Sequence, residues 1–353
     1  MRISTAAALT ALLGAAVPAH AQVTVFGLLD LSLNRVSASG AGSLSRLEAD
    51  GNTSSRLGFR GSEDLGSGLK ANFWLEAAVS PDTGVGGATS TNNKDSVNTG
   101  GLTWGRRATV GLQGDWGELR LGRDYVPTFG NLTTSMHPFG TNGVGSSGLL
   151  FYPVNTGGTT VRTNVRASNS FGYFLPDNAA GIYGAAMVAL GEQQSDTPTE
   201  KDGNYQGVRL GWKNEQWNVA LATGKTRYAT GDYTQSNVGA NVKLGDVRLM
   251  TLWGENKVGS TRTRAQMVGT QWQVTAQGEL RLAYTRLKAR GVASDADHIA
   301  VGYMHDLSKR TALYANWARI DNKDLGTRFN VGQAPTTPGG SSSGFDLGML
   351  HRF

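Results

Sequence analysis

The sequence contains no cysteine and, beyond its first residues, no long apolar run. The lack of cysteine excludes a disulfide scaffold and thiol chemistry. A membrane-spanning helix needs about 18 or more apolar residues, so a bilayer could be crossed only by strands closed into a barrel, which satisfies every backbone polar group. Only 9 prolines accompany 49 glycines, which favours many strands joined by tight turns.

The N-terminal residues have the pattern of a secretory signal peptide. Arg2 precedes an apolar run that reaches Val17, and the small residues Ala19 and Ala21 flank His20. This pattern predicts cleavage before Gln22. We therefore expect residues 1–21 to be a signal peptide and residues 22–353 to form a single barrel domain.

Apolar and polar residues alternate in many segments. In the first of them, Leu29 and Leu33 share one face while Asp30 and Asn34 share the other. The same period-two pattern recurs at 69–77, 208–213, 238–244 and 280–284. The connections between these segments are alternately short and long. Together these patterns predict an all-β fold: a transmembrane antiparallel β-barrel of about 16 strands, with short turns at one end and long loops at the other.

The chain ends on an alternating segment, 345–353, whose last residue is Phe353. A barrel must present a lipid-facing last strand to the machinery that inserts it. We therefore expect Phe353 to act as an assembly signal.

Several segments carry a resemblance to a known family. They are 23–30, 55–71, 106–112, 119–124 and 307–314, together with the terminal Phe353. In order and spacing they resemble the general porins of Gram-negative bacteria, of the neisserial and β-proteobacterial type, and most of all the anion-selective members. The resemblance implies an outer-membrane diffusion channel for small hydrophilic solutes, assembled as a homotrimer in contact with outer-membrane lipid and lipopolysaccharide. It also implies a third outer loop folded into each barrel.

The longest departure from alternation lies where the resemblance puts that loop. No charged residue occurs between Asp124 and Arg162, and aromatic and aliphatic residues are scattered among glycines. An exposed loop of this length would be polar, so we expect this one to pack against a wall and to be functional. The alternative is a disordered loop or one that contacts another subunit of a trimer.

Arginines are expected to line the constriction. The resemblance assigns three of them to the lumen by motif position, and alternation adds one on the Arg56 face and one on the Arg166 face. Arg107 should point away from Arg106, unless a bulge exchanges the two. The expected anion pathway comprises Arg56, Arg106, Arg166, Arg60, Arg162 and Arg107.

Carboxylates are distributed differently from these bases. None occurs between Asp124 and Asp177, so the loop has no acidic residue to balance the arginines. An unbalanced positive charge at a narrow point favours anions such as phosphate or small organic acids. Other carboxylates fall on predicted lumen faces and should leave a preference without excluding cations: Asp30, Glu76, Glu118 and Glu279.

Other functions find little support in the sequence. The bases are dispersed, which argues against nucleic acid as a partner. We expect no cofactor and no catalytic site, because the best nucleophile pair is His137 with Ser135. No metal site is expected either, since the cluster of Asp295, Asp297 and His298 suits a solvated turn. The alternative that remains is an outer-membrane barrel with a plugged lumen that acts as an enzyme or adhesin.

Overall fold

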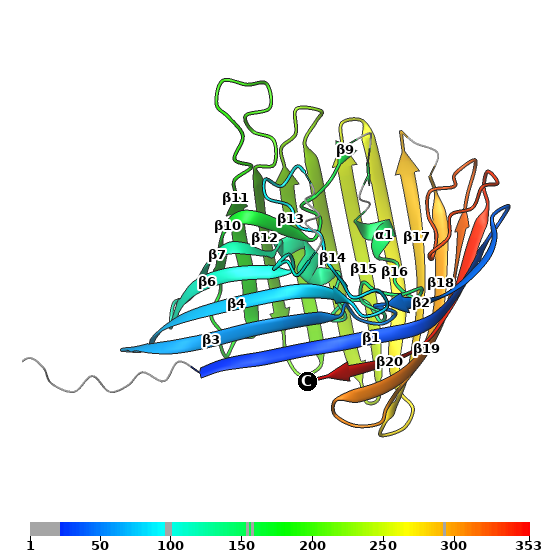
Figure 1. Ribbon diagram of the computed structural model, residues 1–353, viewed down its shortest axis with the longest axis horizontal. Helices are drawn as coiled ribbons and strands as arrows, with labels where there is room; N and C mark the ends of the chain where they lie inside the picture. The colour runs from blue at the N-terminus through cyan, green and yellow to red at the C-terminus, as the bar shows by residue number, and fades with distance from the viewer. Residues whose placement is uncertain (1–21, 96–100, 153–154, 157–158, 292–293) are drawn as a thin grey trace, which may run out of the picture.

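A computed structural model describes residues 22–95, 101–152, 155–156, 159–291 and 294–353; the predicted signal peptide lies outside them. These residues form an eighteen-stranded antiparallel sheet. Two of its strands, β2 (Gly42–Ala49) and β5 (Val85–Gly86), are short additions at the rim. The other sixteen close a barrel, as the alternation predicted (Figure 1).

The sixteen wall strands follow one another in sequence order. Their bounds are β1 (Gln22–Ala38), β3 (Arg56–Gly66), β4 (Leu69–Ser80), β6 (Arg107–Gly114), β7 (Gly117–Tyr125), β10 (Arg166–Phe174), β11 (Ile182–Ala189), β12 (Tyr205–Lys213), β13 (Trp217–Thr226), β14 (Tyr233–Leu244), β15 (Val247–Val258), β16 (Thr261–Gln273), β17 (Gly278–Arg290), β18 (Ala296–Asp306), β19 (Thr311–Asn322) and β20 (Ser341–Arg352).

The first and last strands close the barrel. β1 pairs with β20 from Leu28 opposite Arg352 to Ala38 opposite Ser342. β1 is 17 residues long, and its other edge pairs with β3 near the start and with β2 near the end. No strand edge is therefore left open along the wall, which a barrel in lipid requires.

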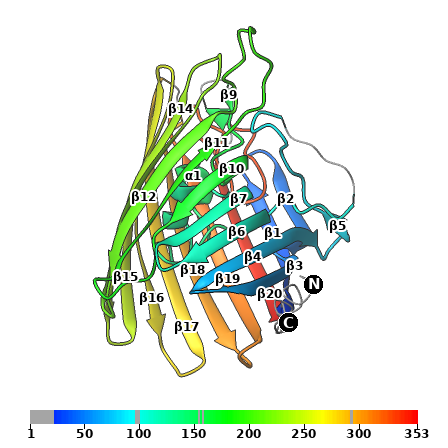
Figure 2. The ribbon, with the colours of Figure 1, turned by 90° about the vertical axis from the view of Figure 1, so that its left-hand side faces the viewer.

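Connections alternate between short turns and long loops, and the two kinds lie at opposite ends of the barrel (Figure 2). The longest connection among the wall strands joins β7 to β10, which are nevertheless neighbours in the sheet. It contains the 3-10 helix η1 (Pro127–Asn131), the short helix α1 (Gly148–Phe151), and the two-residue strands β8 (Asn155–Thr156) and β9 (Thr159–Thr160). We call residues 126–152 the inner segment.

The two faces of the wall differ as the alternation predicts. On β1, Leu33 is 60% exposed on the outside, whereas Asp30 and Asn34 are buried on the inside. Exposed Val, Leu and Ile side chains continue this outer surface around the barrel, with exposed tryptophans on β12, β13, β16 and β19. An apolar outer band with aromatic residues suits a lipid environment. No helix among the described residues is long and apolar enough to cross a membrane.

Phe353 closes the ladder between the two ends of the barrel. Its N–H donates to Gly27 O and its carbonyl accepts from Gly27 N–H, both at 3.0 Å. The phenyl ring lies over Gly27, so closely that a Cβ built at Gly27 would be 2.1 Å from the ring. The ring of Phe353 therefore fits here only because residue 27 is a glycine.

Deleting Phe353 is expected to lower the amount of assembled protein in outer membranes by about tenfold or more. The deletion removes two ladder hydrogen bonds, each worth roughly 1 kcal/mol, and the terminal ring expected to serve as the assembly signal. Heat-modifiable barrel in outer-membrane fractions is the measurement, with Phe353→Tyr as the aromatic control. Normal recovery of the deletion variant would contradict the assignment.

Candidate functional site

Three of the predicted arginines meet at one place on the inner wall. Arg106 Nε donates to Glu76 Oε1 at 2.6 Å, and Arg56 Nη1 lies 3.5 Å from the same oxygen. Arg106 and Arg166 both donate to the Tyr125 hydroxyl, at 2.9 and 2.8 Å. The cluster therefore holds three guanidinium groups against one carboxylate, and we call it the arginine cluster.

Local structure explains how the cluster forms. Arg56 and Arg166 are the first residues of β3 and β10, and Tyr125 is the last residue of β7. Arg166 and Tyr125 are also register partners across the ladder, and the Arg166 guanidinium stacks on the Tyr125 ring at 4.4 Å. Together with β4, which carries Glu76, these three strands bring the cluster together where they reach the long loops.

The predicted opposition of Arg106 and Arg107 is wrong. Arg107 begins β6 and follows its alternation into the lumen, where its guanidinium stacks on Trp74 at 4.6 Å and lies 3.6 Å from Asp124. Arg106 precedes the strand in a bend, so alternation does not apply to it and it turns to Glu76. Both arginines consequently serve the inner wall.

Arg60 and Arg162 lie apart from the arginine cluster. Arg60 lies on the inward face of β3, with its guanidinium over the rings of both Phe26 and Trp74, at 5.4 and 5.2 Å from their centroids. Arg162 was expected on the Arg166 face. It lies before β10 begins, in a bend where alternation does not hold. Its backbone N–H donates to the Tyr228 hydroxyl at 3.4 Å. It is not among the residues that line the cavity beside the arginine cluster.

Two further cations on β12 complete the site. Arg209 donates to Asn131 Oδ1 of the inner segment at 2.8 Å and stacks on Tyr183 at 4.9 Å. Lys213 lies over the same ring at 5.6 Å. Neither residue was predicted to line the pathway, although alternation with Val208 puts both on the inner face of β12.

These five cations line one cavity of about 740 Å³ between the wall and the inner segment. The wall contributes Arg56, Arg106, Arg166, Arg209 and Lys213, and the inner segment contributes apolar and hydroxyl groups. Among the described residues, this lining includes no Asp or Glu. The cavity is therefore lined by positive charge, and Glu76, the carboxylate that contacts Arg56 and Arg106, also accepts from Trp74.

Side-chain amides of the wall hold the inner segment in place. Asn237 donates to Thr128 O at 2.9 Å, Asn241 to Ser135 O at 2.6 Å, and Asn256 to Phe151 O at 2.8 Å. In return, Asn131 donates to Asn237 Oδ1 at 2.9 Å. The inner segment is thus bound through its backbone carbonyls to β14 and β15, and we call Asn237, Asn241 and Asn256 the wall amides.

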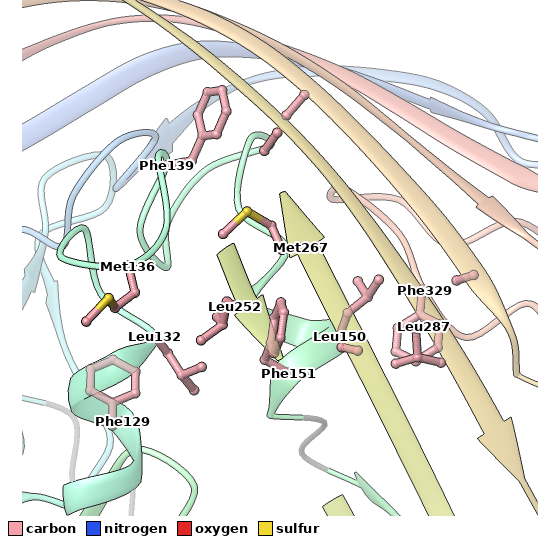
Figure 3. Close-up of a cluster of buried hydrophobic side chains, with 14 of the residues drawn as sticks. Phe129, Leu132, Met136, Phe139, Leu150, Phe151, Leu252, Met267, Leu287 and Phe329 are labelled. Atoms are coloured by element: carbon pink, nitrogen blue, oxygen red, sulfur yellow. The ribbon is translucent and has the colours of Figure 1, made fainter. Parts of the chain in front are cut away.

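Apolar packing accompanies these hydrogen bonds. Phe129, Met136 and Phe151 of the inner segment belong to one buried apolar cluster with Leu252 and Met267 of the wall, and Phe151 lies beside Leu252 (Figure 3). Gly239 and Gly254 leave the room for them, since a Cβ at either would lie 2.8 Å from Met136 or Phe151 respectively. These apolar contacts add to the hydrogen bonds that join the inner segment to β14 and β15.

Comparison with known proteins identifies the family. The family model described as Gram-negative porin matches residues 7–325. The chain belongs to the Gram-negative porin family. The porin is 34% identical, over 99% of its length and 98% of the relative's, to Outer membrane porin protein 32 of Delftia acidovorans. It is 40% identical to the Major outer membrane protein P.IA of Neisseria meningitidis serogroup C, over 24% of the chain and 18% of that protein.

Solved structures agree with the sequence relatives. The structure named "Anion-selective porin from Comamonas acidovorans" is 33% identical, covers 94% of the porin and 100% of its own chain, and superimposes with a TM-score of 0.83. The porin is therefore a barrel of the Gram-negative outer membrane and a channel protein, not an enzyme. The resemblance seen in the sequence is confirmed.

The predicted lumen carboxylates are engaged by neighbours. Asp30 is fully buried: its Oδ2 accepts from the N–H groups of Asn52 and Thr53 at 2.9 and 2.6 Å, and its Oδ1 from the Tyr314 hydroxyl. Glu118 accepts from Asn72 at 3.1 Å and from Arg120 at 2.6 Å. Asp30 thereby fixes the chain before β3, and it is not among the residues that line the cavity.

The histidine of the inner segment is structural. His137 is buried, and its Nε2 pairs with Ser147 Oγ at 2.6 Å and not with Ser135, the best nucleophile pair that the sequence offered for it. Its Nδ1 accepts from the Phe139 N–H at 3.1 Å, so the proton of the neutral ring is on Nε2. Burial, with a smaller contribution from His298, lowers the pKa of His137 to about 3. The sequence missed Ser147 because the two residues meet only in the folded segment.

Acidification should therefore loosen the inner segment. The pKa of histidine is about 6.5 in the unfolded state, and the pKa of folded His137 is lower. The contribution of neutral His137 to the free energy of unfolding is therefore fully present above pH 6.5 and is lost as the pH falls from about 6.5 toward 3. Each pH unit in that window lowers the free energy of unfolding by up to about 1.4 kcal/mol. We expect open-channel noise in planar bilayers to rise between pH 6.5 and 4, and His137→Asn to reduce the rise; His298, whose Nε2 lies 3.2 Å from Val144 O of the inner segment, stays in that variant. Noise that rises equally in His137→Asn would contradict this assignment.

Metal and catalytic sites find no support in the described residues. No group of three or more His, Cys, Asp or Glu side chains there is arranged to hold a metal ion. Asp295 pairs with Lys288 at 2.7 Å, and Asp297 pairs with Arg286 at 2.9 Å and with Lys323 at 3.4 Å. These carboxylates serve ion pairs on the barrel exterior.

Proposed function

We propose that the porin is a passive diffusion channel that prefers anions such as phosphate or small organic acids. The observation that carries the proposal is the 740 Å³ cavity lined by five cations and, among the described residues, by no carboxylate. In this proposal the inner segment narrows the pore, and a permeant passes between it and the arginine cluster. Guanidinium groups stay ionised and offer paired donors to phosphate or carboxylate oxygens.

The expected electrostatic energies are large enough to produce a preference for anions. A unit charge about 4 Å from an ion contributes roughly 1 kcal/mol in bulk water and several times more beside low-dielectric protein. About 1.4 kcal/mol corresponds to a tenfold ratio, so two or three uncompensated cations suffice for a tenfold preference. The relative named as an anion-selective porin, at 33% identity over nearly the whole chain, lends further support.

The assembly is part of the same proposal. We infer a homotrimer embedded in outer-membrane lipid, in contact with lipopolysaccharide at the long-loop end. A solved structure of similar fold is titled as a trimer form of an outer membrane protein of Vibrio cholerae, and we propose the same state here. Gel filtration in detergent with light scattering tests the subunit number.

The zero-current reversal potential in a planar bilayer under a KCl gradient tests the preference. A potential of the sign for chloride is expected from the wild-type protein. Cation preference would overturn the proposal and would point to wall carboxylates such as Glu118. The absence of any conductance would favour a plugged barrel.

A further inference from the structure

The cavity beside the arginine cluster is lined by aromatic rings as well as by cations. Phe174 at the end of β10 and Tyr183 of β11 contribute rings from two neighbouring strands (Figure 1). Tyr125 and Phe129 add a stacked pair, with ring centroids 5.2 Å apart and an interplanar angle of 5°. We call these four residues the aromatic lining. Small inorganic anions gain nothing from such surfaces, so the lining indicates a different class of permeant.

The cations of the cavity that lack a carboxylate partner are the ones that lie over these rings. Arg166, Arg209 and Lys213 form no ion pair with a carboxylate of the described chain, whereas the other two cations share one. Arg166 lies 4.4 Å from the ring centroid of Tyr125. Arg209 and Lys213 lie 4.9 and 5.6 Å from that of Tyr183. Uncompensated positive charge and aromatic surface are therefore offered at the same places.

Apolar residues continue the aromatic lining on both sides of the cavity. The inner segment contributes Val126 and Pro127, and the wall contributes Leu175, directly after β10. Sites for small organic molecules are mostly apolar, contain a few placed polar groups and measure about 300–1,000 Å³. The cavity, at about 740 Å³, has that size and that kind of lining. It suits a ligand that combines an anionic group with an apolar ring.

We propose that, among the anions the channel admits, the cavity prefers aromatic carboxylates such as benzoate. The carboxylate accepts from Arg209 or Lys213, because a guanidinium stacked on a ring keeps its N–H groups in its own plane, where they can donate. The ring of the permeant lies against Phe174 and Tyr183. An aromatic ring gains more from aromatic neighbours than a saturated ring does, because their quadrupoles attract in offset and edge-on arrangements. The inference rests on the anion pathway proposed above and names its substrate class.

The test compares three carboxylates as blockers of the chloride current through single channels in planar bilayers. They are benzoate, cyclohexanecarboxylate, which has nearly the same size and the same charge but no π system, and acetate. The measured quantity is the concentration that halves the current. Benzoate should act at a concentration about threefold or more below that of cyclohexanecarboxylate. It should act about tenfold or more below acetate, which has no ring to bury.

Substitutions in the aromatic lining show where the preference arises. In Phe174→Leu/Tyr183→Leu the side chains stay apolar but lose their rings, so the difference between benzoate and cyclohexanecarboxylate should fall below about twofold. Tyr183→Phe keeps the ring and should keep the difference. Phe171→Leu is the matched control, because Phe171 also belongs to β10 but is 45% exposed on the barrel exterior. Its two half-blocking concentrations should equal those of wild type.

Each outcome decides the assignment. A preference for benzoate that is lost in Phe174→Leu/Tyr183→Leu and kept in Phe171→Leu supports it. Equal action of benzoate and cyclohexanecarboxylate on wild type overturns it, as does an undiminished preference in the double variant when heat modifiability shows a normal barrel. The wild-type reversal potential is measured in the same bilayers before either acid is added. Chloride preference together with equal action of the two acids would refute the aromatic preference and leave the anion channel standing, whereas cation preference would refute both.

Discussion

Replacing Arg56, Arg106 and Arg166 together by glutamine is expected to lower the anion-to-cation permeability ratio by about tenfold or more. The substitution removes three of the five cations that line the cavity. It also leaves Glu76 without the two guanidinium groups that now contact it. The reversal potential under a KCl gradient should therefore move toward zero and can pass to the cation side.

A second variant is expected to change the permeability ratio in the opposite direction. Glu76→Gln removes the carboxylate of the arginine cluster and keeps an oxygen that can accept from Arg106, so the ratio should rise instead. Arg319→Gln is the matched control, because Arg319 lies on the exterior and is paired with Asp321 at 2.8 Å. Its reversal potential should equal that of wild type.

The result that contradicts the prediction is an unchanged ratio in the triple variant when barrel formation, measured by heat modifiability on gels, is normal. The selectivity would then have to come from cations elsewhere on the wall, and Arg209 with Lys213 would be the next pair to neutralise. Arg209 is the more informative of the two, because it alone also donates to the inner segment.

The sequence predicted the barrel well because alternation is a local property with a global consequence. Period-two segments with buried Asp30 and exposed Leu33 fix which face of each strand is wet, and the alternation of short and long connections fixes which end is which. Motif position also brought Arg56, Arg106 and Arg166 to one place. Alternation failed to place Arg106 relative to Arg107 and failed to place Arg162, since Arg106 and Arg162 each lie in a bend before a strand begins.

The details of the inner segment were beyond sequence reasoning for a different reason. Its contacts join residues about a hundred positions apart, such as Asn237 and Thr128. The alternation of apolar and polar residues along one strand cannot predict such contacts. One signal was available: Asn237 and Asn241 share the inner face of β14, and buried amides need partners. A run of amides on one inner face can thus indicate that a segment of backbone lies across it.

Replacing the wall amides Asn237, Asn241 and Asn256 together by alanine is expected to release the inner segment from β14 and β15. Each amide donates to a backbone carbonyl, and such a bond contributes roughly 1 kcal/mol net, with a larger cost where a buried carbonyl is left unpaired. A loss of about 3 kcal/mol changes an open-to-docked ratio by roughly two orders of magnitude. Under the proposed role of this segment, single-channel conductance should increase and become noisier.

Asn72→Ala is the matched control, because Asn72 is also an amide of the inner wall but donates to Glu118 and not to the inner segment. Its conductance and noise should remain those of wild type. Wild-type conductance in the triple variant would mean that apolar packing of Phe129, Met136 and Phe151 holds the segment without the amides. A larger conductance with an unchanged reversal potential would separate the two parts of the pore: the segment would set its width, and the arginine cluster on the opposite wall would set its charge.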